Sequence, residues 1–264
     1  MTLATLRLNK NEERRLRGGH LWIYSNEVDK QASPLKSFEP GQQVLVESSQ
    51  GKPLGVAYVN PQSLICARLL SQGQTPFAQR DIEQRLQQAL ALREQLFEHP
   101  CYRLVYGESD LLPGLVVDRF GDHLSVQFNT AGMEALREPV LAALETLLAP
   151  ASILLRNDAS VRQLEGLPSE VECVLGQSPE DVELVENGVR FVAPLASGQK
   201  TGWFYDQRPN RAWLRDIVKG KRVLDVFSYV GSFGVQAGAF GASEVWCNDA
   251  SELALEKAHE NAAL

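Results

Sequence analysis

The stretch RVLDVFSYVGSFG, residues 222–234, joins an apolar run to a turn that carries two glycines. The run 222–227 predicts a buried strand, the turn 228–234 leads into a helix that ends near residue 240, and 244–248 predicts a second strand. Ser251 then caps a helix that runs to the last residue. Strand, turn, helix, strand and helix in this order are typical of the beginning of an open α/β sheet.

Two carboxylates mark this segment: Asp225 lies in the first predicted strand, and Asp249 follows the second, 24 residues later. Open α/β sheets bind ligands outside the carboxyl ends of their strands, where a carboxylate can accept hydrogen bonds from ribose hydroxyls. Gly231 and Gly234 form G-x-x-G, whereas nicotinamide cofactor folds prefer G-x-G-x-x-G. An acidic residue here opposes a pyrophosphate but tolerates a cationic centre, which favours S-adenosylmethionine over NAD. In the alternative interpretation, both glycines only allow close packing of strand and helix.

A second cluster, GQKTGWFYDQRPNR at residues 198–211, lies just before the predicted sheet. It mixes aromatic side chains with Lys200, Asp206, Arg208 and Arg211. Its position beside the glycine turn indicates a binding role. The alternative is a solvated loop that enters a helix with Asp206 as its cap.

The first 75 residues are rich in predicted strands. Short apolar runs at 43–47, 54–59 and 65–70 predict strands, and 11–18 predicts a short charged helix. This pattern is typical of a small barrel-like module. A linker at 72–76 ends it.

Residues 76–190 predict an α+β unit in which strands carry helices on one face. Apolar residues at helical spacing predict helices over 78–97 and 133–148, and 115–128 predicts a hairpin. Asn187-Gly188, between alternating apolar residues, predicts a further hairpin, and we place the second boundary near it. The expected fold class is α/β and α+β multidomain, with predicted units 1–75, 76–190 and 191–264.

Composition and charge exclude several classes of protein. The chain is 44% hydrophobic and 22% charged, which argues against disorder. No uniformly apolar stretch of membrane-spanning length and no signal-peptide core are present, so a cytoplasmic location without membrane contact is expected. Four cysteines and four histidines are scattered without zinc-ligand or disulfide spacing, so no metal site is predicted. The net charge of −7 divides into +3 for 1–75, −10 for 76–190 and 0 for 191–264.

Taken together, residues 199–211, 225–234 and 248–250 resemble the bacterial 23S (large-subunit) ribosomal RNA cytosine-5 methyltransferases. The resemblance continues upstream, because RRLRGGHLWIYS (14–25) is similar to the N-terminal PUA domain of that family and GESDLLPGLVVD (107–118) to its central α+β domain. It implies a class I, Rossmann-like methyltransferase domain that binds S-adenosylmethionine. RNA is the implied partner.

The resemblance also implies roles for individual residues. The expected wall over the cofactor consists of Gln199, Lys200, Thr201, Phe204, Asp206 and Arg208. The methionine end would meet Asp225 and the backbone at Tyr229, Gly231 and Gly234, and Asp249 would hold the ribose. Candidate RNA contacts are Arg14, Arg15, Arg17 and Trp22, since cations meet phosphates and aromatic rings stack on bases. Trp22 could alternatively be a core residue of the small barrel.

The motifs for catalysis are missing from the sequence. Members of this family use a cysteine thiolate to attack the cytosine ring, but no Asp-Pro-Pro motif occurs here, and Cys247 fits a buried strand residue. A complete doubly wound sheet also needs more strands than 191–264 supplies. We therefore expect the chain to be an N-terminal portion of a longer methyltransferase, with the catalytic residues beyond Leu264. A shortened relative stabilised as a homo-oligomer is the alternative.

The sequence thus predicts an S-adenosylmethionine-dependent RNA cytosine-5 methyltransferase, whose present chain alone transfers little or no methyl. One rival hypothesis is a non-catalytic RNA-binding protein with a vestigial cofactor fold. A nicotinamide oxidoreductase is a weaker rival, because G-x-G-x-x-G is absent.

Overall fold

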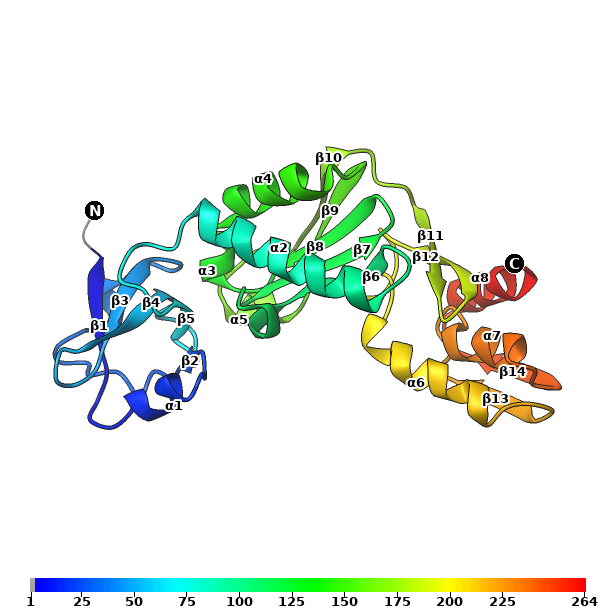
Figure 1. Cartoon of the computed structure of the whole chain (residues 1–264), viewed down its shortest axis with the longest axis horizontal. Coiled ribbons are helices and arrows are strands. Elements are labelled where there is room, and N and C mark those ends of the chain that lie inside the picture. Colours follow the sequence, from blue (N-terminus) through cyan, green and yellow to red (C-terminus); the bar gives the residue numbers. More distant parts are fainter. Residues whose placement is uncertain (1–2) are drawn as a thin grey trace.

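The computed structural model describes residues 3–264, so the first two residues of the predicted unit 1–75 lie outside it. The molecule is elongated, with the N-terminal sheet at one end, a larger central sheet in the middle and the last helix at the other end (Figure 1). Within residues 3–264, no helix combines the length and apolar character that crossing a membrane requires.

The N-terminal unit is a five-stranded sheet in the order β1-β3-β4-β5-β2. β1 runs parallel to β3, and the other neighbours are antiparallel. Alternate apolar side chains of the strands, with Leu16 from the helix, fill one buried core. The elements are β1 (Ala4–Arg7), α1 (Glu13–Arg17), β2 (Trp22–Ile23), η1 (Leu35–Ser37), β3 (Gln43–Glu47), β4 (Pro53–Val59) and β5 (Ala67–Ser71).

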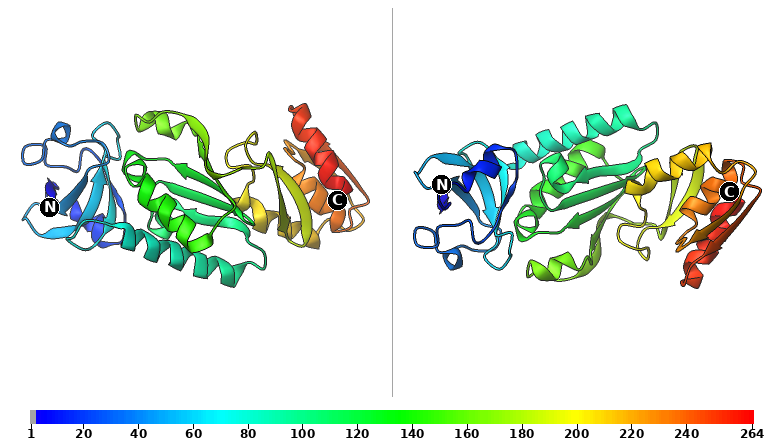
Figure 2. Two further views of the ribbon diagram at one scale, coloured as in Figure 1. Left: turned by 90° about the horizontal axis from the view of Figure 1, so that it is seen from above. Right: turned by 90° about the horizontal axis from the view of Figure 1, so that it is seen from below.

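The central unit is a second five-stranded sheet, in the order β10-β9-β8-β7-β6. α2 and α4 contact each other and cover one face, whereas α5 lies on the other side (Figures 1 and 2). The predicted layering therefore holds for the two long helices. The elements are α2 (Gln79–Leu96), β6 (Cys101–Tyr106), η2 (Gly107–Asp110), β7 (Leu115–Phe120), β8 (His123–Phe128), α3 (Ala131–Glu134), α4 (Arg137–Leu148), β9 (Ser152–Asn157), α5 (Val161–Leu164) and β10 (Glu170–Gly176).

The single helix predicted over 133–148 is wrong, because the structure divides it into α3 and α4. Pro139 lies in the first turn of α4. In a continuous helix its ring nitrogen could not donate to the carbonyl of Ala135, whereas in a first turn no donor is required. The proline therefore begins a new helix.

The last part of the chain contains the hairpin β11–β12 and the parallel pair β13–β14. Asn187 and Gly188 both have positive φ, as the predicted tight turn requires. α7 packs against both β13 and β14, and Ser251 caps α8 by accepting a hydrogen bond from the Ala254 amide. The elements are β11 (Asp181–Glu186), β12 (Val189–Pro194), η3 (Tyr205–Gln207), α6 (Arg208–Trp213), η4 (Leu214–Asp216), β13 (Arg222–Val226), α7 (Ser232–Ala239), β14 (Glu244–Asn248) and α8 (Glu252–Ala263).

A third apolar core joins the last part of the chain to the central sheet. It contains Phe120 and Leu154 of the central sheet, Phe191 of β12 and the rings of Trp203 and Tyr205. The predicted boundary at residue 190 falls inside β12, and the division into three units stays a prediction.

One face of the β13–β14 pair is uncovered. Leu224 is 63% exposed and Trp246, its partner in the register, is 42% exposed. The opposite face, which holds Val223 and Val245, is covered by α7 and α8. This pair is therefore layered on one side only.

Candidate cofactor site and RNA-contact residues

The loop that follows β13 has an unusual backbone. Phe227, Tyr229 and Gly231 all have positive φ, which folds the chain tightly between β13 and α7. Asp225 Oδ2 accepts a 2.8 Å hydrogen bond from the Gly234 amide, which ties the strand to the first turn of α7. Burial raises the pKa of the Asp225 carboxyl above its ordinary value, and the charge of Asp249 adds to this effect.

Asp249 lies at the carboxyl end of β14, where its carboxylate bridges two loops. Oδ2 accepts a 2.8 Å hydrogen bond from the Tyr229 amide, and Oδ1 accepts a 3.0 Å bond from the Ser251 amide. These backbone donors, Ser251 first, lower the pKa of Asp249, so the side chain is ionised at neutral pH. Each oxygen keeps a further acceptor site, which a pair of ribose hydroxyls could use.

Tyr229 connects this loop to the predicted wall. Its hydroxyl accepts a 3.1 Å hydrogen bond from the Gln199 amide and donates a 3.4 Å bond to the Gly202 carbonyl. Its ring meets that of Phe204 edge to face, with 5.8 Å between centroids, and Lys200 Nζ lies 5.0 Å from the Phe204 centroid. The structure therefore brings Gln199, Lys200 and Phe204 to the same loop that Asp249 holds.

The other three predicted wall residues face the central unit. Thr201 is buried and bonded to Asp118 of β7. The guanidinium of Arg208 stacks on the Phe97 ring at 4.4 Å, and Asp206 is exposed beside the same groove. A role for Thr201, Asp206 and Arg208 as cofactor contacts stays a prediction.

The glycines of the turn contribute to packing. A Cβ on Gly234 would lie 2.6 Å from Cys247 Sγ and 3.1 Å from Val245 Cγ1. On Gly231 it would lie 2.9 Å from the Cβ of Ala258 in α8. The close-packing interpretation therefore accounts for both glycines. Their role as backbone contacts to a cofactor stays a prediction.

Sequence reasoning missed Glu186, a fully buried carboxylate at the end of β11. It accepts hydrogen bonds from Arg211 at 2.5 and 3.0 Å, from Arg208 at 3.2 Å and from Trp203 Nε1 at 3.1 Å. Burial alone would raise its pKa, but the hydrogen bonds from Arg211 outweigh burial and hold it below the ordinary value. The two arginines close after the aromatic cluster were the only signal that a buried anion is needed.

Cys247 occupies β14 and is half-buried. Burial and the neighbouring charge of Asp225 raise the pKa of its thiol. Because the thiolate is the nucleophilic form, this environment disfavours a catalytic role. The position of Cys247 fits the strand residue that the sequence predicts.

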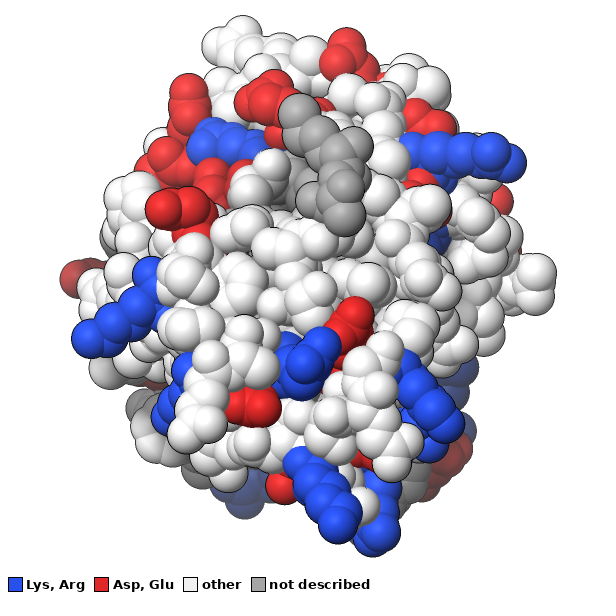
Figure 3. Space-filling model, turned by 90° about the vertical axis from the view of Figure 1, so that its left-hand side faces the viewer, with Lys and Arg blue, Asp and Glu red and all other residues white. Residues whose placement is uncertain are grey.

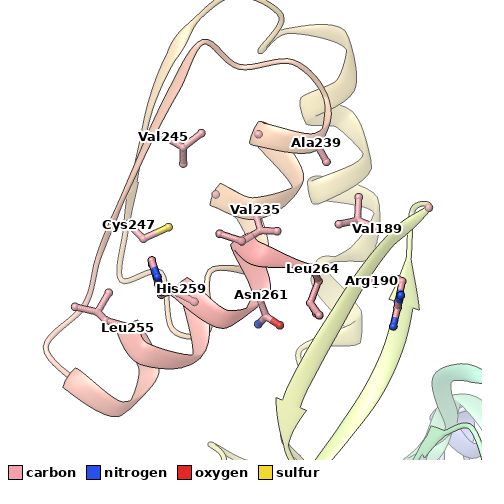
Figure 4. Close-up of a pocket in the computed structure, with 15 residues that line it drawn as sticks. Val189, Arg190, Val235, Ala239, Val245, Cys247, Leu255, His259, Asn261 and Leu264 are labelled. Carbon is pink, nitrogen blue, oxygen red and sulfur yellow. The ribbon is translucent and has the colours of Figure 1, made fainter.

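A cavity of about 730 Å³ opens between α7, α8 and the β11–β12 hairpin, and Figure 4 shows Val235, Cys247 and His259 at its wall. Of the predicted cofactor residues, only Gly234 lines it. The cavity therefore lies beside the carboxyl edge that holds Asp249 and Tyr229, and is separate from it.

The predicted RNA contacts lie on the N-terminal unit. Arg14 and Arg17 are exposed on α1, whereas Arg15 pairs with Glu27 at 2.7 Å. Trp22 is half-buried, and its Nε1 donates a 2.6 Å hydrogen bond to Glu108 of the central unit. Figure 3 looks onto this end of the molecule and shows basic side chains gathered along its lower part, the level at which Figure 1 places α1. RNA contact by these four residues stays a prediction.

Family models match most of the chain. One, described as S-adenosylmethionine-dependent methyltransferase, matches residues 123–264, and one described as PUA-like domain matches residues 6–72. The predicted PUA-like unit and the Rossmann-like methyltransferase fold are therefore confirmed.

Curated relatives match nearly all of this chain. The ribosomal RNA large subunit methyltransferase I of Tolumonas auensis is 40% identical over 269 residues, which cover 99% of this chain and 66% of the relative. The protein of the same name from Erwinia tasmaniensis is 38% identical, over 97% of this chain and 65% of the relative. The chain thus spans just under two thirds of the length of these relatives. The prediction that it is the N-terminal portion of a longer methyltransferase stays a prediction.

Two solved structures share the fold of the whole chain. A Streptococcus mutans protein assigned to the SAM-dependent methyltransferases superposes with a TM-score of 0.82 at 22% identity, over 98% of this chain and 66% of its own. A second structure, assigned as a methyltransferase and solved in complex with SAH, gives the same TM-score and identity over 99% of this chain and 66% of its own.

Proposed function

Since this chain belongs to the S-adenosylmethionine-dependent methyltransferase family, we propose that it serves the methylation of large-subunit ribosomal RNA, at carbon 5 of a cytosine. The RNA substrate is supported by the names of the curated relatives and by the PUA-like unit. The cytosine and the carbon atom rest on the resemblance of residues 199–211 and 225–234 to the cytosine-5 enzymes. The cytoplasmic location and the three-unit division belong to the same proposal.

The residues at the carboxyl edge of β13 and β14 fit the cofactor. Asp249 offers an ionised carboxylate with unused acceptor sites, and the tight loop at Tyr229 leaves the strand end open above it. Asp225 adds a second carboxylate on the same strand pair, which suits a cationic ligand. When bound, S-adenosylmethionine supplies an electrophilic methyl group. Within residues 3–264, no cysteine is placed as an activated nucleophile for cytosine.

The observation that carries this proposal is the hydrogen bond from the Tyr229 amide to Asp249, because it joins the glycine turn to the ribose-binding carboxylate in one rigid unit. Calorimetry with S-adenosylmethionine tests it on the wild type, Asp249→Ala and the control Glu252→Ala, an exposed acid in the next helix. We expect saturable binding that Asp249→Ala abolishes and Glu252→Ala keeps. Equal binding by all three proteins would contradict the site.

The RNA part of the proposal is tested in cells. Large-subunit ribosomal RNA from strains with and without the gene is mapped for 5-methylcytosine by bisulfite sequencing. A cytosine that is methylated only when the gene is present supports the proposal. Identical maps would contradict it and favour the rival, a non-catalytic RNA-binding protein.

A further inference from the structure

A cavity of about 360 Å³ lies where the N-terminal sheet meets the central unit, within the size range of ligand pockets. Arg68 comes from β5 of the N-terminal sheet, Glu108 from the η2 turn and Asn129 from the residue after β8. The turn belongs to the GESDLLPG motif, for which neither the fold nor the cofactor site accounts. The cavity is therefore built from both units.

Two buried polar atoms at this cavity have no hydrogen-bond partner: Arg68 Nε, a donor, and Asn129 Oδ1, an acceptor. The Arg68 side chain is only 8% exposed. Its Nη1 donates to Glu165 at 3.3 Å, whereas Nε lies 3.6 Å from Glu108 Oε1, beyond hydrogen-bond length. Buried unpaired polar groups destabilise a fold, and a bound ligand is one explanation for their presence.

The charges around the cavity exclude an anion as the best ligand. Arg68 stands against two carboxylates, Glu108 and Glu165, so the local balance is negative and disfavours a phosphate. A neutral planar group with a donor beside an acceptor satisfies both unpaired atoms. Adenine, cytosine and guanine carry an exocyclic amine next to a ring nitrogen or carbonyl.

An aromatic ring stands at the rim. Tyr106 lines the cavity and is 58% exposed, which is unusual for so large an apolar ring. The guanidinium of Arg103 lies 5.4 Å from its centroid and supports it from the neighbouring groove. Exposed tyrosines beside polar pockets serve as stacking platforms for unpaired bases.

The predicted RNA contacts on α1 connect directly to this cavity. Trp22 is the register partner of Arg68 and donates to Glu108, which lines the cavity. Arg15 Nη2 in turn donates to the Trp22 carbonyl at 3.4 Å. A strand whose phosphates lie along α1 can therefore reach the cavity with its bases.

We propose that this cavity binds one unstacked, amine-bearing base of single-stranded RNA. Asn129 Oδ1 accepts from the exocyclic amine, Arg68 Nε donates to the adjacent acceptor, and the ring of Tyr106 stacks on a neighbouring base. The inference rests on the proposed RNA substrate and adds to it a recognition pocket between the PUA-like and central units.

Fluorescence anisotropy tests the cavity with labelled short oligo(C), oligo(A) and oligo(U) at one fixed salt concentration. The variants are Asn129→Ala, Tyr106→Ala and Tyr106→Phe, with Asn210→Ala as an exposed control on α6. Melting curves establish that each variant is folded. We expect the wild type to prefer oligo(C) and oligo(A) to oligo(U), since uracil has no exocyclic amine.

Asn129→Ala and Tyr106→Ala should each weaken binding about tenfold. Asn129→Ala should also remove the preference among bases, whereas Tyr106→Phe and Asn210→Ala should match the wild type. If the wild type binds RNA and the folded cavity variants bind equally well, this inference is overturned while the proposed function stands. A wild type that binds none of the RNAs would overturn both.

Discussion

Thr201 Oγ1 donates a 2.5 Å hydrogen bond to Asp118 Oδ2, although the two residues stand 83 positions apart. Asp118 is fully buried and also accepts a bidentate pair of bonds from Arg103, at 2.8 and 2.9 Å. The carboxylate therefore ties the 198–211 segment to β7 of the central unit. Because Lys200 and Phe204 flank this tie, it sets where the predicted wall stands relative to Tyr229.

The first prediction concerns this tie. Thr201→Val keeps the shape of the side chain but leaves one Asp118 lone pair unpaired in the interior, so the free energy of unfolding should fall by about 1–3 kcal/mol. Thr75→Val, on the exposed linker, should change it by less than about 0.5 kcal/mol. Urea unfolding measures both. Equal losses at the two positions would show that the bond contributes nothing specific.

The second prediction concerns Glu186 and pH. The pKa of Glu186 is lower in the fold than its model value of 4.5, so its ionised form stabilises the fold above that pH. This contribution is lost as the pH falls from about 4.5 through the folded-state pKa. Glu186→Gln should cost about 3–5 kcal/mol at neutral pH, because Arg211 is left buried without a charge partner.

Glu183→Gln is the matched control on the same strand, since the Glu183 side chain is 78% exposed. Melting temperatures followed from neutral to acid pH should show the wild type and Glu183→Gln losing stability together, while Glu186→Gln starts lower and falls less. Parallel acid profiles for all three proteins would contradict the assignment to Glu186.

The third prediction separates two glycines of one helix. Gly234→Ala places a Cβ 2.6 Å from Cys247 Sγ, so α7 must move away from β14, and we expect a loss of about 1–3 kcal/mol. Gly238→Ala meets nothing closer than 3.9 Å and should gain about 0.5–1 kcal/mol from helix propensity. Denaturant unfolding measures both changes. Adding Cys247→Ala to Gly234→Ala should recover part of the loss, and no recovery would contradict the steric explanation.

The local signals in the sequence predicted the local structure well. The β13-α7-β14-α8 order followed from apolar periodicity and the glycine turn, and Asn187-Gly188 gave the hairpin because its backbone requires positive φ. Pro139 was a signal that the prediction of one helix over 133–148 overlooked.

The side-chain partners could not be predicted in the same way. The Thr201–Asp118 bond and the four donors around Glu186 join segments that meet only through tertiary packing. No period or motif in the sequence encodes such a pairing. For the same reason, the predicted wall divides into residues that meet Tyr229 and residues that face Phe97 or Asp118.

The fourth prediction concerns Asp225, whose pKa is raised by burial. A carboxyl with a raised folded-state pKa is better tolerated when neutral, so Asp225→Asn should leave the melting temperature unchanged or raise it at neutral pH. Its amide oxygen can still accept from the Gly234 amide, whereas Asp225→Ala removes that acceptor and should lower the melting temperature.

Asp225→Asn should nevertheless weaken S-adenosylmethionine, because a cationic ligand loses a nearby negative charge. Calorimetry on the two variants separates the effects of charge and fold. A fully retained affinity in Asp225→Asn would remove Asp225 from the predicted cofactor contacts.

The fifth prediction concerns the basic helix α1. Arg14 and Arg17 are exposed and make no ion pair within residues 3–264, so their charges are free to meet phosphates. Each phosphate contact releases condensed counterions, so the double variant Arg14→Ala, Arg17→Ala should weaken all RNA sequences alike and reduce the slope of log affinity against log salt by about 1 per contact. Arg222→Ala, at an exposed position of β13, is the control. A salt slope that Arg14 and Arg17 leave unchanged, while Arg222→Ala lowers it, would place the RNA on the opposite end of the molecule, away from the PUA-like unit.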